Sequence, residues 1–237
     1  MVLHGSPSRV VNKYAAVLRS LPHDSLYEYD LDARMLRRLD LSWLRDTEDV
    51  TYVSYGRVAV VEEPPGGGIR VLDVSEAGGG RQLDFIPTTN SRTSANGNEG
   101  LSYDPRSGAF IVAQEKGPKR IISVRPTANG GGGWSTLVNG DESFSGLGDL
   151  SAVEFVPQLD QLFVLSQESS RLLRTTMDGR VLQQMSVVGS QPEGLAFSPD
   201  GVTLFVVSEV SALRPRKHSL TGLNCSSHAQ RAAAARI

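Results

Sequence analysis

The sequence predicts an all-β fold, a β-propeller of about five blades whose first and last blades are incomplete. The first observation behind this prediction is a recurring motif. NEGLSYDP at 98–105 and PEGLAFSP at 192–199 share their apolar positions, and two weaker copies complete a set that begins at Glu48, Glu99, Ser151 and Glu193. The intervals between copies fall near the roughly 40 to 50 residues of one propeller blade.

The second observation is that each copy is followed by another short apolar run, rich in residues that favour strands. These runs are too short for independent helices. Turn-forming segments such as DPRSG at 104–108 separate the two runs, so each copy predicts a β-hairpin. The second strands are expected at 57–63, 109–115, 161–168 and 203–209.

The third observation is that further strands follow each hairpin, which predicts four strands in a unit. Third strands are expected at 68–76, 119–126 and 170–179, and fourth strands at 81–87, 134–138 and 180–188. Glycine and proline interrupt the chain too often for the helix pairs of a solenoid of similar period.

The two ends of the chain depart from this repeat. The segments 13–20, 25–32 and 34–42 are expected to form the second, third and fourth strands of a first blade, whose first strand is missing or disguised within residues 1–10. Repeat character stops after Glu209. The predicted organisation is therefore a divergent N-terminus at 1–12, a propeller at 13–210 and a divergent, disordered tail at 211–237.

Composition excludes several classes of function. The 24 Lys and Arg residues nearly balance 26 Asp and Glu residues, so no overall charge attracts nucleic acid. One cysteine allows no internal disulfide, and all four histidines lie outside the aligned hairpins, which argues against a Ser-His-Asp hydrolase or a histidine metal site. No run approaches the roughly 20 apolar residues of a membrane span, and no signal peptide is visible, so the chain as written is expected to be soluble.

A first set of acidic residues recurs where the first strand of each blade begins. Glu48, Glu99 and Glu193 occupy this position, and Ser151 replaces the acid in the remaining copy. Because carboxylates around one axis repel each other unless a cation or proton joins them, these three glutamates are candidate ligands of a hard cation such as calcium. We favour the alternative that they accept backbone hydrogen bonds from the neighbouring blade.

A second acidic set ends the second strands. It comprises Glu62 or Glu63, Glu115, Glu168 and Glu209, and a basic residue follows each within a few positions: Arg70, Lys119 or Arg120, Arg171 and Arg214. These side chains could form a charged channel mouth. Ion pairing between strands at exposed blade ends is the favoured interpretation, with Glu115 and Arg120 as the clearest pair.

Four aromatic residues also recur at blade spacing. Tyr52, Tyr103, Phe155 and Phe197 share the parity of the apolar residues around them. We therefore predict that they pack between blades rather than form a stacking platform for a ligand.

The motifs together resemble the SdiA-regulated, or YjiK-like, family of β-propellers. The resemblance spans about residues 13–210 and rests on DLDARMLRRLDL, TEDVTYV with RVAVVEE, NEGLSYDPRSGAFIVAQEKGPKRI, DLSAVEFVPQLDQLFVLSQESSRLL and QPEGLAFSPDGVTLFVVSE. It implies a five-bladed propeller, with relatives often exported or membrane-attached and linked to calcium handling and to phytase-like or lactonase-like propellers.

Two functional hypotheses follow. The favoured one is a non-enzymatic propeller that binds a small molecule or protein at one channel mouth, with calcium. The alternative is a calcium-dependent hydrolase of the phytase-like or lactonase-like sort, with Glu99 or Glu193 as metal ligand or general base. The incomplete ends also fit a truncated or misjoined gene product that does not close its ring.

Overall fold

The structure is a computed structural model, and it contains five antiparallel β-sheets. It describes residues 2–6, 9–20, 23–30, 34–63, 67–88, 97–128, 131–188, 191–197, 203–208 and 216–219. The first sheet contains β1 (Val2–Ser6), β2 (Arg9–Ser20), β3 (His23–Asp30) and β4 (Met35–Asp40). The second contains β5 (Thr47–Ser54), β6 (Arg57–Glu62), β7 (Gly68–Asp73) and β8 (Arg81–Pro87).

The remaining three sheets continue the same order along the chain. The third contains β9 (Asn98–Asp104), β10 (Ala109–Gln114), β11 (Arg120–Pro126) and β12 (Gly132–Asn139). A short helix, α1 (Gly140–Ser143), leads to the fourth sheet of β13 (Ala152–Val156), β14 (Gln161–Ser166), β15 (Arg171–Thr176) and β16 (Val181–Ser186). The fifth contains β17 (Pro192–Phe197), β18 (Thr203–Ser208) and β19 (Arg216–Ser219).

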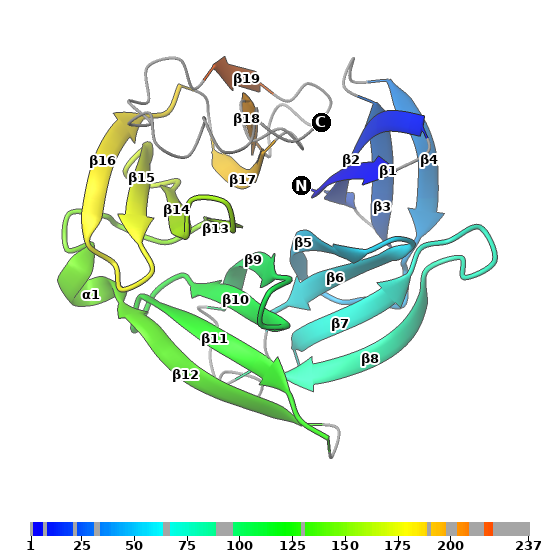
Figure 1. Cartoon of the computed structure of the whole chain (residues 1–237), viewed down its shortest axis with the longest axis horizontal. Helices are drawn as coiled ribbons and strands as arrows, with labels where there is room; N and C mark the ends of the chain where they lie inside the picture. The colour runs from blue at the N-terminus through cyan, green and yellow to red at the C-terminus, as the bar shows by residue number, and fades with distance from the viewer. Residues whose placement is uncertain are drawn as a thin grey trace.

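The five sheets are the blades of a propeller. They stand around a central space, with β5, β9, β13 and β17 nearest the centre and β8, β12 and β16 outside (Figure 1). β1 lies beside both β5 and β17, so the first and fifth blades meet at the inner wall. All described strand pairs are between consecutive strands of one blade, so the ring is closed by packing between blades 1 and 5.

The predicted all-β propeller is confirmed. Residues 2–6 form β1 and pair with β2, so the first strand of the first blade is present within residues 1–10, as one of the two alternatives expected, and this blade has four strands rather than being incomplete. The fifth sheet has three strands among the described residues, and its third strand, β19, lies in the segment predicted as a tail. The other residues of 211–237, where disorder was predicted, lie outside the described residues.

The turn between β9 and β10 shows how the repeated turn segments close a hairpin. The Asp104 carboxylate accepts a hydrogen bond from the Arg106 backbone N–H at 2.9 Å, and the Asp104 carbonyl accepts one from the Gly108 N–H at 2.9 Å. Gly108 adopts a φ of 70°, which costs little for glycine. Asp and Gly in DPRSG therefore fix this turn.

The core lies between the blades. Buried side chains form four clusters, each shared by two adjacent blades, and the largest fully buried side chains include Phe163, Ile111 and Leu162. The recurring aromatic residues belong to these clusters: Phe155 and Phe197 are buried, and Tyr52 and Tyr103 pack against clusters while partly buried. Their predicted role in packing between blades is confirmed. Within the described part of the chain, no helix is long and apolar enough to cross a membrane.

Candidate metal centre

The start of β5 and the end of β6 bring acidic side chains to one mouth of the propeller. Asp46 and Glu48 lie where β5 begins, and Glu63 directly follows β6. Antiparallel pairing of β5 with β6 places these two strand ends side by side. The Glu63 backbone N–H also donates a hydrogen bond of 3.0 Å to the Asp46 carbonyl, which fixes the ends of the hairpin to each other.

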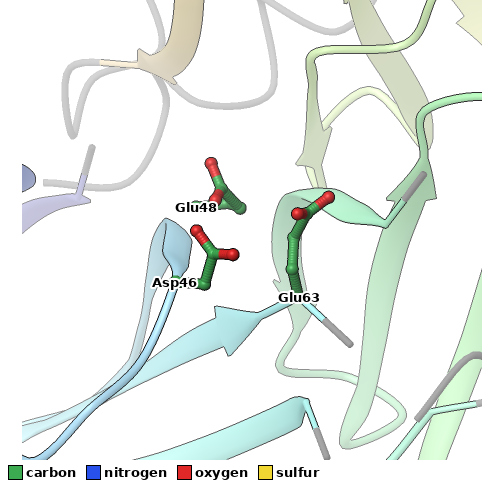
Figure 2. Close-up of side chains that lie close together, drawn as sticks. All are labelled: Asp46, Glu48 and Glu63. Carbon is green, nitrogen blue, oxygen red and sulfur yellow. The ribbon is translucent and has the colours of Figure 1, made fainter. Parts of the chain in front are cut away.

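Three carboxylates meet at this point. One carboxylate oxygen from each of Asp46, Glu48 and Glu63 lies within 4.8 Å of the other two, and all three residues are half-buried. Figure 2 shows the carboxylates of Asp46 and Glu48 close together, with Glu63 extending toward the same space. Among the described residues this is the acidic group close enough to hold a metal ion.

Glu63 also reaches the neighbouring blade. Its Oε1 accepts a hydrogen bond of 2.9 Å from the Gly97 N–H, at the residue before β9. A Cβ atom on Gly97 would lie only 2.3 Å from this oxygen, so a larger residue would displace the carboxylate. Glycine at position 97 therefore allows Glu63 to connect blades 2 and 3.

Glu99, in β9, adds a fourth acidic group to this mouth. Burial, followed by the negative charges of Glu48, Glu63 and Glu115, raises the pKa of Glu99 to about 10. Burial also raises the pKa of Glu63, whose side chain is hydrogen-bonded to Glu99. At neutral pH the Glu99 carboxyl therefore keeps its proton, because a further negative charge there is unfavourable.

The chemistry of these residues fits a hard divalent cation. Carboxylate oxygens are the ligands that calcium takes in proteins, and calcium tolerates irregular geometry. Burial is the main cause of the raised pKa of Glu99, and the negative charges of Glu48, Glu63 and Glu115 add to it. A cation at Asp46, Glu48 and Glu63 would offset that charge.

The structure relates the first predicted acidic set to this mouth only in part. Glu48 belongs to the carboxylate triad, and Glu99 is coupled to it through its charge interactions with Glu48 and Glu63. Glu193 lies in β17 and is half-buried at the start of the fifth blade; its role as a ligand stays a prediction. Ser151, which breaks the acidic set, donates a hydrogen bond of 3.1 Å from its hydroxyl to the Pro192 carbonyl and so links blades 4 and 5.

Carboxylates that accept backbone hydrogen bonds from the next blade are also present, at positions the sequence did not single out for that role. Buried Asp49 in β5 accepts a hydrogen bond of 2.9 Å at Oδ2 from the Leu101 N–H of β9. Burial raises the pKa of Asp49, although the two backbone donors at Leu101 and Val50 oppose that effect. Asp49 and Glu63 thus link blade 2 to blade 3.

Two members of the second acidic set, Glu115 and Glu168, form ion pairs with one lysine, whereas Glu63 belongs to the carboxylate triad. The Lys116 ammonium lies 3.0 Å from Glu115 and 2.6 Å from Glu168, so it joins blade 3 to blade 4. Arg120 donates a hydrogen bond to Gln114 and lies over the Trp134 ring. Arg171 begins β15 and is exposed. Glu209 lies outside the described residues.

Sequence reasoning did not single out Asp46, and it placed Glu63 only at the channel mouth. Asp46 lies two residues before the aligned acidic position, outside the predicted strand, and adopts a φ of 52°. Short polar residues tolerate this left-handed conformation better than most. A polar residue preceding the strand was the available signal, and it recurs as Asp149 before the fourth blade.

Comparison with known proteins supports the fold and identifies a family. A family model described as SdiA-regulated matches residues 11–213. The chain is similar to a gluconolactonase from Xanthomonas campestris, with a TM-score of 0.53 and 12% identity over 84% of this chain and 70% of that one. It is also similar to the periplasmic gluconolactonase of Pseudomonas aeruginosa, with a TM-score of 0.51 and 15% identity over 88% of this chain and 68% of that one.

A third solved structure is itself described as a β-propeller domain, that of Swd1 from Myceliophteria thermophila. Its TM-score is 0.52 at 12% identity, and the match covers 86% of this chain and 61% of that domain. At these identities the three structures show a common fold.

Proposed function

This chain belongs to the SdiA-regulated family, and we propose that it is a propeller module that binds calcium at the mouth between blades 2 and 3 and, beside the cation, a small-molecule or protein ligand. The observation that carries this proposal is the carboxylate triad of Asp46, Glu48 and Glu63, whose oxygens lie within 4.8 Å of one another. Glu99 would complete the acidic surroundings of the ion.

Electrostatics supports a cation in this position. Charge repulsion from Glu48 and Glu63 contributes to the raised pKa of Glu99. A divalent cation would remove part of that repulsion and favour the ionised form of Glu99. Calcium binding is therefore expected to release protons and to tighten as the pH rises.

Ligand binding at the same mouth follows from where the triad lies. The three acidic residues are half-buried at the ends of strands rather than enclosed in a blade. A calcium ion takes six to eight oxygen ligands, which leaves positions for water or for oxygen atoms of a ligand. The proposed ligand is thus one that presents hydroxyl, carbonyl or carboxylate oxygens.

A calcium-dependent hydrolase is the second candidate, because two of the structurally similar proteins are described as gluconolactonases. A cation at the triad would polarise a carbonyl or phosphoryl oxygen. Glu99 holds a proton at neutral pH beside the triad, where it can act as a general acid toward a departing oxygen. Glu63, hydrogen-bonded to Glu99, would orient that proton.

The experiment that tests calcium binding compares the full chain with two variants by titration calorimetry and thermal unfolding, with calcium chloride and with chelator. At a free calcium concentration 100-fold above Kd, the wild type should gain about 2.7 kcal/mol of stability. Glu63→Gln should lose this gain, and the matched control Glu168→Gln, in the Lys116 ion pair, should keep it. Folded wild-type protein with no heat of binding and no stabilisation would overturn the proposal.

Enzymatic activity is tested separately with phosphomonoester and lactone substrates. The hydrolase predicts turnover that requires calcium, falls in Glu63→Gln and persists in Glu168→Gln. Calcium binding without turnover of either substrate class would support the proposed binding module and would contradict the proposed hydrolase.

A further inference from the structure

Two consecutive glutamates stand at the end of β6, and their side chains lie on opposite faces of blade 2. Glu62 is the last residue of the strand, and Glu63 follows it. Successive side chains of a strand alternate between faces, and Val61 belongs to the core shared with blade 3 whereas Val60 belongs to the core shared with blade 1. Glu63 reaches the Gly97 N–H before blade 3. Glu62 therefore lies on the side of blade 1.

Glu62 is enclosed, and its two carboxylate oxygens have separate partners. The residue is 2% exposed. Its Oε1 accepts a hydrogen bond of 2.8 Å from the Arg45 backbone N–H, and its Oε2 accepts one from Nε of Arg70 in β7. One oxygen thus binds the segment that leads into β5, and the other binds a neighbouring strand of the same blade.

Arg70 is itself held from several directions. Its Nη1 donates a hydrogen bond of 2.8 Å to the Gln82 side chain in β8. Its guanidinium lies 4.6 Å from the centre of the Phe85 ring and 5.8 Å from the centre of the Trp43 ring. A planar guanidinium held in this way restricts the carboxylate that pairs with it. Glu62 therefore presents Oε1 to the Arg45 N–H from a fixed position.

The segment that Glu62 holds carries one carboxylate of the triad. Arg45 directly precedes Asp46, whose carbonyl accepts the hydrogen bond of 3.0 Å from the Glu63 N–H. Asp46 adopts a φ of 52°, a conformation that a residue with a side chain keeps only where its surroundings fix it. The hydrogen bonds to Glu62 and Glu63 fix the chain on both sides of the Asp46 side chain, which lies beside Glu48 (Figure 2).

We propose that Glu62 is a positioning residue of the metal centre: it holds the Arg45 N–H, and through it the Asp46 carboxylate, without binding the cation itself. This inference rests on the proposed function, because it assigns Glu62 a role at the calcium site. Removing a group that holds a metal ligand in place typically weakens metal binding about 10- to 100-fold. The two adjacent glutamates thus have different roles, since Glu63 is a ligand and Glu62 supports one.

Two conservative substitutions separate the reach of Glu62 from its charge. Glu62→Asp keeps the charge that pairs with Arg70 but is one methylene shorter, so it withdraws from the Arg45 N–H. Glu62→Gln keeps the length and an acceptor oxygen but loses the charge. Titration calorimetry of the full chain with calcium chloride should give a Kd at least about 10-fold above that of the wild type for Glu62→Asp, and within about threefold of it for Glu62→Gln.

The matched control is Glu28→Asp, which shortens the carboxylate of another Glu–Arg pair. Glu28 lies 3.0 Å from Arg37, and both residues belong to blade 1. This variant should keep the calcium Kd of the wild type. A Kd that Glu62→Asp leaves unchanged, or that Glu62→Gln raises as much as Glu62→Asp does, would overturn the positioning role.

Hydrogen exchange of the Arg45 N–H is measured without calcium, and it separates failure of this inference from failure of the proposed function. The N–H should exchange at least about tenfold faster in Glu62→Asp than in the wild type and in Glu62→Gln. Folded wild-type protein that binds no calcium would overturn the proposed function, and with it any role at a metal centre. Calcium binding by a wild type whose Arg45 N–H exchanges like an exposed amide would overturn the positioning role alone, whichever variants fold.

Discussion

The contact between blades 2 and 3 and the contact between blades 3 and 4 use the same blade positions with different charges. At the first, Glu63 meets the Gly97 N–H and the Glu99 carboxyl. At the second, Glu115 occupies the position of Glu63, and Lys116 bridges it to Glu168. The contact between blades 2 and 3 thus gathers acidic groups, whereas at the contact between blades 3 and 4 a lysine pairs with them.

The residue after each glutamate explains this difference. Pro64 follows Glu63, whereas Lys116 follows Glu115. The four-stranded repeat places both glutamates at the end of the second strand of a blade. The fold therefore sets the position of both glutamates, and the residue that follows each one differs in charge.

The largest expected effect comes from Gly100→Ala, which tests how closely blades 3 and 4 approach. The added Cβ would lie 2.5 Å from the Val153 nitrogen, a backbone atom that cannot turn aside. We expect a loss of about 3 kcal/mol in the free energy of unfolding, measured in urea. Blade 2 carries Asp49 at the position that corresponds to Gly100. The requirement for glycine at this position therefore applies to the contact between blades 3 and 4.

Gly146→Ala is the control for that substitution, because a Cβ atom there has no neighbour within 4 Å. It should change stability little. Equal destabilisation by the two alanines would show that close packing is not what distinguishes this contact.

A smaller effect is expected from Glu99→Gln, which tests the excess of negative charge between blades 2 and 3. The pKa of Glu99 is raised to about 10 from an ordinary 4.5, so the wild type loses stability as the pH rises between these values. The Glu99→Gln variant lacks this pH dependence of stability. Its free energy of unfolding should exceed that of the wild type by about 2 kcal/mol at about pH 8 without calcium. The measurement is urea unfolding across that range.

Parallel pH profiles for the wild type and Glu99→Gln would contradict a retained proton at Glu99. Added calcium should reduce the difference between them if the cation offsets the same charges. Chelator should restore it.

The smallest effect is expected from Lys116→Met, which removes the ammonium group that pairs with Glu115 and Glu168 between blades 3 and 4. Because Lys116 and Glu168 are both partly exposed, the loss should be only about 0.5 kcal/mol and should shrink at high salt. A double-mutant cycle with Glu168→Gln measures the coupling. A coupling unaffected by salt would mean that the bridge is not electrostatic in origin.

Most of the fold could be predicted because the repeat fixes which residues face the neighbouring blades. The starts of β5, β9, β13 and β17 fall within one residue of the four aligned positions. β1 was expected only as one of two alternatives for residues 1–10, and β19 was not expected, because their residues do not resemble the corresponding strands of the other blades. Their place in the sheets depends on pairing with β2 and β18.

The site was predicted less completely. Glu48 and Glu99 were singled out from their position in the repeat, and the structure relates both to one mouth. Asp46 lies outside the strand, and Glu63 was assigned to a different set, so no sequence period links them. The hydrogen bond from the Ser102 hydroxyl to Glu154 likewise joins residues of two different blades.

The sequence by itself determined the strands, their alternation and the spacing of the blades, because these depend on local apolar patterns and turns. The tertiary structure decided which acidic groups meet. Strand period fixes the side of the sheet on which a carboxylate lies, but the distance from Asp46 to Glu63 depends on hairpin closure, and the partners of Glu99 and Glu154 depend on packing between blades. The acidic side chains of this propeller therefore come close enough to interact only where two strands or two blades meet.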